Sequence, residues 1–164
     1  MYLARLKRLT DSQVKVEDKM FATLDPSSRR LRFPREREII ITDTVGFIRD
    51  LPQDLVKAFR ATLEELESAD LFLHVIDALD PGLIGQIAAV ENTLEQLGLH
   101  ETPRILVLNK IDLLSNEKKP ALKNRLPTAV MISAKNKNTF SPLLAAVENA
   151  IWQDRPIDKG SWAI

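Results

Sequence analysis

Apolar residues recur along this chain in short continuous runs and in stripes with helical spacing. The runs predict buried strands at 38–42, 70–77, 104–108 and 128–132, and alternation of polar and apolar residues predicts a half-buried strand at 29–33. The stripes predict helices at 2–10, at 51–69, from Asp80-Pro81 to Gly98, and at 141–152. A further helix, mostly polar, is predicted at 115–125. This order predicts an α/β fold in three layers, with a mostly parallel sheet and helices on both faces.

The composition is that of a globular protein. Of 164 residues, 45% are hydrophobic and 28% are charged, which excludes collagen-like, disordered and disulfide-scaffold classes. Cysteine is absent, which excludes a thiolate metal site and a cysteine nucleophile, and only two histidines are present. No apolar run approaches the length of a membrane span, and the first residues lack the apolar core of a signal peptide. A cytoplasmic protein is therefore expected.

Charge is unevenly distributed, although the whole chain is neutral. Residues 1–38 carry ten Lys/Arg against six Asp/Glu, a net charge of +4 that the remainder balances. The basic excess is densest in an arginine patch formed by Arg29, Arg30, Arg32, Arg35 and Arg37. Such a patch can contact nucleic-acid phosphates, or it can be the charged, solvated edge of a sheet, which is the commoner situation.

Three short motifs follow predicted strands, where open α/β sheets bind their ligands. They are Asp43-Thr44-Val45-Gly46, Asn109-Lys110-Ile111-Asp112 and Ser133-Ala134-Lys135. An aspartate in the first position can orient Mg²⁺ or its bound water, and a glycine beside it lets a backbone N–H approach a phosphate oxygen. Each motif alone also fits ordinary turn chemistry. All three motifs in this order, each directly after a predicted strand, are unlikely to occur together by chance.

Together these motifs resemble those of guanine-nucleotide-binding proteins of the Ras-like superfamily. Residues 21–26 with 29–31 resemble the first switch of the HflX family of GTPases, and residues 43–52 with 59–65 resemble its second switch and the helix that follows. The resemblance covers roughly residues 7–150. It implies a Ras-like P-loop NTPase G domain over residues 1–155, followed by a C-terminal tail at 156–164, with GTP or GDP and Mg²⁺ as ligands.

The resemblance assigns the guanine ring to two of the motifs. The implied base-binding residues are Asn109, Lys110, Asp112, Ser133, Ala134 and Lys135. By this resemblance Asp112 accepts two hydrogen bonds from the ring edge of guanine, Asn109 ties its loop together, and the stem of Lys110 covers the flat face of the base. The backbone N–H of Ala134 is expected to meet the base carbonyl. Ser133 and Lys135 are expected to hold that loop in shape.

The phosphates and Mg²⁺ are assigned to the two switches. The implied set is Phe21, Thr23, Asp43, Thr44, Val45 and Gly46, with Thr23, Asp43 and Gly46 as its catalytic members. Thr23 and Asp43 are expected at Mg²⁺, and the Gly46 N–H is expected to face the terminal phosphate. Phe47 stands where Ras-type proteins place a water-orienting glutamine, so slow intrinsic hydrolysis, or a group supplied by a partner, is expected.

The phosphate-binding motif G-x-x-x-x-G-K-[ST] does not occur in this sequence. No glycine precedes Gly46, and no lysine is followed by Ser or Thr. Residues 6–10 resemble the helix that follows that loop, so a truncated G domain without its first strand, its loop and the N-terminal domain of the family is expected. The absent strand belongs between the strands ending at Thr42 and Asp77. Unpaired backbone and an exposed apolar seam are expected there, so we expect the chain to fold poorly, to repack or to need a partner. Because the phosphate-binding motif is absent, low nucleotide affinity is also expected.

Three functions are compatible with these residues. The first is an HflX-type GTP-binding protein, expected to be a monomer, in which GTP hydrolysis is coupled to binding of the large ribosomal subunit and its rRNA. The second is a remnant module that binds ribosomes or RNA without nucleotide. The third is an unrelated phosphate-handling enzyme that uses Asp43 and Asp77. The remaining candidate, His74, lies in a predicted buried strand and is expected to be a hydrogen-bonded core residue.

Overall fold

Six strands form one sheet in the computed structural model, which describes residues 2–8, 28–33, 37–43 and 66–152. The strands are β1 (Tyr2–Arg8), β2 (Ser28–Phe33), β3 (Arg37–Asp43), β4 (Leu71–Asp77), β5 (Arg104–Asn109) and β6 (Val130–Met131). The helices are α3 (Leu83–Gln96), α4 (Lys118–Arg125) and α5 (Ser141–Trp152), with short 3₁₀ helices η1 (Ile111–Leu113) and η2 (Lys137–Thr139). The spatial order of the strands is β2-β3-β1-β4-β5-β6.

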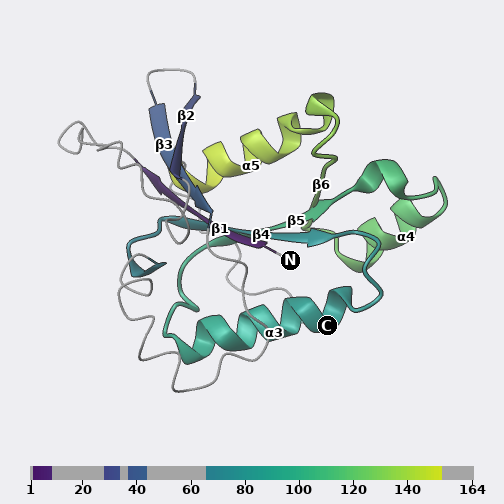
Figure 1. The fold of residues 1–164 in the computed structure, drawn as a ribbon, viewed down its shortest axis with the longest axis horizontal. Coiled ribbons are helices and arrows are strands. Elements are labelled where there is room, and N and C mark those ends of the chain that lie inside the picture. The colour runs from purple at the N-terminus through teal and green to yellow at the C-terminus, as the bar shows by residue number, and fades with distance from the viewer. Residues whose placement is uncertain (1, 9–27, 34–36, 44–65, 153–164) are drawn as a thin grey trace, which may run out of the picture.

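Helices cover both faces of the sheet, with α5 on one side and α3 on the other, as the three-layer prediction requires (Figure 1). On one face α5 packs through Val147 against a cluster that includes Leu73 and Val107. On the other face α3 packs through Leu83 and Ile87 against side chains of β4 and β5. Alternate residues of each strand point to opposite faces, so the continuous apolar runs of β4 and β5 fill both layers. Among the described residues, no helix is long and apolar enough to cross a membrane.

Most of the predicted elements are confirmed where the structure describes them. The strands at 29–33, 38–42, 70–77 and 104–108 correspond to β2, β3, β4 and β5, and the helix after Asp80-Pro81 corresponds to α3. Gly98 follows that helix with a φ of +72°, a conformation that favours glycine and ends the helix. The strand predicted at 128–132 is shorter, because only Val130 and Met131 pair with β5. The helix predicted at 51–69 lies mostly outside the described residues.

The helix predicted at 2–10 is wrong, because Tyr2–Arg8 forms strand β1. This strand lies between β3 and β4, the position where an empty seam was expected, and it pairs antiparallel with both neighbours. Leu6 is fully buried there, opposite Ile41 on one side and Leu71 on the other. The expectation of an unpaired seam is therefore also wrong, whereas poor folding and the need for a partner stay predictions. The sheet is parallel through β4, β5 and β6, whereas the pairings β1–β3, β1–β4 and β2–β3 are antiparallel, so the prediction of a mostly parallel sheet is confirmed only for these three strands.

The arginine patch lies mainly on β2, which is an edge strand of the sheet. Two of its members pair with one acidic side chain of β3: Arg30 lies 3.3 Å and Arg32 lies 2.6 Å from Glu38. Arg37 pairs with Glu148 of α5 at 3.1 Å and stacks over the ring of Trp152. Intramolecular pairing of this kind agrees with a charged edge strand rather than with an open nucleic-acid surface. Arg35 lies outside the described residues.

Candidate nucleotide site

Four strands end at one edge of the sheet and bring the sequence motifs to it. β4 and β5 run parallel, and Asp77 is the register partner of Asn109 at their ends. β3 runs in the same direction as β4 because both are antiparallel to β1, so Asp43 also ends its strand toward this edge. Ser133 follows β6 directly after Ile132. Residues from four segments far apart in sequence therefore lie at the edge at which open α/β sheets bind ligands.

Asn109 joins the two loops of the predicted base site. Its side-chain oxygen Oδ1 accepts the N–H of Lys110 at 2.7 Å and the N–H of Ala134 at 2.9 Å. The backbone N–H of Ile111 also donates to the carbonyl of Ile132, at 3.2 Å. The loops after β5 and β6 are therefore held together without a ligand. The Ala134 N–H, expected to meet a base carbonyl, has Asn109 as its partner in this structure, so a base would share or replace that hydrogen bond.

Asp112 is presented to solvent with one oxygen engaged. Its Oδ1 accepts the hydroxyl of Ser133 at 2.5 Å, while the residue as a whole is exposed. That hydrogen bond holds the pKa of the Asp112 carboxyl below its ordinary value, because it favours the charged form. Ser133 is only 1% exposed, so the hydroxyl that holds Asp112 is itself fixed by the core. The result is an exposed, negatively charged acceptor in one preferred orientation.

Lys110 is oriented by a carboxylate whose importance the motifs did not indicate. Its φ of 65° lies in the left-handed region, and its Nζ lies 2.6 Å from Oδ2 of Asp77. Asp77 also accepts the N–H of Leu79 at 3.0 Å. The hydrogen bond from Lys110 is the main reason that the pKa of the Asp77 carboxyl lies below its ordinary value. The sequence placed Asp77 only at the end of a predicted strand, because its ion pair with Lys110 depends on the register of β4 against β5.

The phosphate and magnesium half of the predicted site is not described to the same extent. Phe21, Thr23, Thr44, Val45, Gly46 and Phe47 lie outside the described residues, and Asp43 is described only as the last backbone position of β3. Within the described ranges, no group of three or more His, Asp or Glu side chains could hold a metal ion. The structure therefore brings together the base-site motifs, and the predictions for the switches stay predictions.

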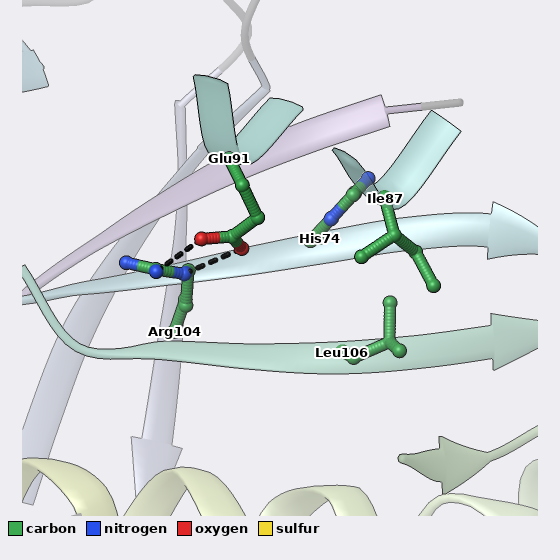
Figure 2. A pocket seen from close by; sticks show the side chains of 5 residues that line it. All are labelled: His74, Ile87, Glu91, Arg104 and Leu106. Carbon is green, nitrogen blue, oxygen red and sulfur yellow. Dashed lines mark hydrogen bonds and ion pairs between the residues drawn. The ribbon is translucent and has the colours of Figure 1, made fainter. Parts of the chain in front are cut away.

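His74 lies on the opposite side of β4 from α5, in a small pocket under α3 (Figure 2). It is 2% exposed, as predicted for a core histidine, but its Nε2 has no hydrogen-bond partner among the described residues. Beside it, the guanidinium of Arg104 binds Glu91 of α3 through two hydrogen bonds, including Nε to Oε1 at 2.7 Å. Burial, with a smaller contribution from Arg104, lowers the pKa of His74 from 6.5 to about 4.

This buried histidine predicts a pH-dependent stability. Since the folded state binds the His74 proton less tightly than the unfolded state, the contribution of neutral His74 to stability is complete above pH 6.5 and is lost as the pH falls toward about 4. A shift of this size corresponds to a loss of about 3 kcal/mol in the free energy of unfolding. Urea unfolding at a series of pH values should show this loss in the wild type and a flatter profile in His74→Leu. Parallel profiles for the two proteins would contradict it.

Known proteins resemble most of this chain in sequence. Residues 5–110 match the family described as "50S ribosome-binding GTPase". The GTPase HflX of Caldanaerobacter subterraneus subsp. tengcongensis is 52% identical over 152 residues, which cover 93% of this chain and 34% of that protein. The GTPase HflX of Escherichia coli is 50% identical over 109 residues, which cover 66% of this chain and 26% of that protein. The chain thus spans about a third or less of the curated relatives it matches.

A solved structure confirms the fold. It is that of Era in complex with MgGDPNP and nucleotides 1506–1542 of 16S ribosomal RNA, with a TM-score of 0.53 and 23% sequence identity, covering 87% of this chain and 49% of that one. Fold and motifs together define a G domain of the Ras-like P-loop GTPase class, and the match over more than half of the sequence places it among the 50S ribosome-binding GTPases. Within that class, the chain belongs to the HflX family of GTPases.

Proposed function

We propose that this chain recognises guanine through the two loops that Asn109 joins, as the base-binding half of an HflX-type GTPase. The observation that supports this most directly is the exposed carboxylate of Asp112, held by the buried hydroxyl of Ser133. Guanine presents two adjacent N–H donors on its ring edge, N1–H and the 2-amino group, and a fixed carboxylate can accept both. Adenine presents an acceptor, N1, at that edge, so it would face Asp112 with repulsion.

The side chain of Lys110 suits the same ligand. Its Nζ is anchored at Asp77, so its alkyl stem is confined between the end of β4 and the loop after β5. A hydrocarbon stem held in this way can cover one flat face of a purine, which removes apolar surface from water. Lys135 is exposed beside Ala134, and its positive charge lies near enough to the Asp112 carboxylate to help hold the pKa of that carboxyl below its ordinary value.

The finer expectations of the family belong to the same proposal. Thr23 and Asp43 would hold Mg²⁺, and Phe21, Thr44, Val45 and Gly46 would surround the phosphates. Mg²⁺ would neutralise the phosphate charge when bound. Hydrolysis coupled to binding of the large ribosomal subunit is proposed for the protein family to which this chain belongs. For these 164 residues, which contain no G-x-x-x-x-G-K-[ST] segment, we propose weak nucleotide binding with little hydrolysis.

The base-recognition proposal is tested with nucleotides that differ only in the base. GMP and AMP carry the same ribose and phosphate, so the difference between them reports base recognition even when phosphate binding is weak. Titration of the ¹⁵N-labelled chain should move the amide signals of Ala134 and Asp112 at lower concentrations of GMP than of AMP. Equal responses to GMP and AMP, or none at millimolar concentration, would overturn the proposal.

A further inference from the structure

The hydroxyl of Thr139 lies inside the loop that follows β6, at the end of η2. Its Oγ1 accepts the backbone N–H of Ser133 at 2.9 Å and lies 2.7 Å from the carbonyl oxygen of Asn136. A hydroxyl has one proton, and the carbonyl of Ser133 is farther away at 3.2 Å, so the proton is best donated to Asn136. One side chain thus connects the beginning and the middle of the same loop.

This connection fixes Ser133, a residue with no access to solvent. Ser133 is 1% exposed, so water cannot replace Oγ1 as the partner of its N–H without rearrangement of the loop. The Asn136 N–H donates to the Ser133 carbonyl at 2.9 Å, which closes the loop from the other side. Both backbone groups of Ser133 therefore bind within this loop, and Thr139 supplies the partner of one of them.

The two groups that Ser133 and its neighbour present are those that organise the proposed base site. The Ser133 hydroxyl donates to Asp112, and the adjacent Ala134 N–H donates to Asn109. We propose that Thr139 is a positioning residue for guanine recognition, which acts by fixing Ser133 and, through it, the carboxylate of Asp112. This inference rests on the proposed function and adds a residue that lies outside the three sequence motifs.

Three variants test this role. Thr139→Val keeps the shape of the side chain and removes the hydroxyl, whereas Thr139→Ser keeps the hydroxyl. The matched control is Thr93→Val on α3, where the hydroxyl also donates to a backbone carbonyl, that of Ala89 at 2.8 Å. The preference for GMP over AMP should fall about 10-fold in Thr139→Val, the order expected from the loss of one buried hydrogen-bond partner. Thr139→Ser should restore it, and Thr93→Val should retain it. Equal preferences in all three variants would overturn the role.

A readout without nucleotide separates this inference from the proposed function. Because Ser133 holds Asp112, the pKa of the Asp112 carboxyl should rise toward its ordinary value in Thr139→Val, measured by carboxyl ¹³C NMR. Exchange of the Ser133 amide hydrogen should accelerate in the same variant and stay slow in Thr139→Ser and Thr93→Val. If the wild type shows no preference for GMP while these two changes occur, the proposed function fails and the positioning of Asp112 stands. If neither change occurs, the positioning role is wrong.

Discussion

Replacing Leu6 by alanine should cost about 2–5 kcal/mol of unfolding free energy, the range for deletion of a buried leucine side chain. Leu6 is fully buried in β1 and belongs to the cluster under α5. Its backbone carbonyl also accepts the N–H of Asp70 at 2.9 Å, which fixes the start of β4 beside it. Since small domains are stable by only about 5–15 kcal/mol, this one substitution should shift the urea midpoint strongly.

The control for this substitution is Leu144→Ala. Leu144 is 40% exposed on α5, so its truncation should change the unfolding free energy by less than about 1 kcal/mol. Hydrogen exchange adds a second measurement, because β1 is paired on both sides and its central amides should exchange only when the sheet opens. A Leu6→Ala variant as stable as Leu144→Ala, or rapid exchange of the amides of β1, would show that these residues do not form the central strand.

The first residues show where the apolar pattern is ambiguous. Leu3, Leu6 and Leu9 repeat every three residues, which indicates one face of a helix. Ala4 and Leu6 also alternate as one face of a strand, and both pack on the α5 side of the sheet. A strand between β3 and β4 forms hydrogen bonds with the backbone groups of both neighbours. If residues 2–8 formed a helix instead, the facing backbone groups of β3 and β4 would have no partners. The need to pair these distant strands, which a short stretch of sequence does not reveal, selects the strand conformation.

The elements of the carboxyl-terminal half were predictable because local and tertiary demands agree there. β4 and β5 are continuous apolar runs that only a sheet covered on both faces can bury, and Gly98 ends α3. The motifs at their ends indicated Asn109, Asp112 and Ser133, and the structure brings these residues together. Thr139 and the pairing of Asp77 with Lys110 were missed, because they depend on the path of a loop and on strand register.

Replacing Asp112 by asparagine should exchange guanine recognition for xanthine recognition, if the proposed function is correct. The variant loses a charged acceptor for the N1–H and the 2-amino group of guanine, so affinity for GMP should fall on the order of 10- to 100-fold. Xanthine has a carbonyl where guanine has the 2-amino group, and the asparagine amide can donate to it while its oxygen accepts from N1–H. The asparagine oxygen can also still accept the Ser133 hydroxyl that holds Asp112, so the loops stay joined.

An increased affinity for XMP tests this prediction more strictly than a decreased affinity for GMP. Misfolding of the variant would also lower an already weak affinity for GMP. An increased affinity for XMP, by contrast, requires that the side chain at position 112 faces the 2-position of the base. Glu117→Gln is the matched control, because it makes the same carboxylate-to-amide change at another exposed position near α4. NMR titrations with GMP, XMP and AMP should show altered base preference in Asp112→Asn alone. If Asp112→Asn and Glu117→Gln keep the preference of the wild type, the carboxylate that Ser133 orients does not read the base.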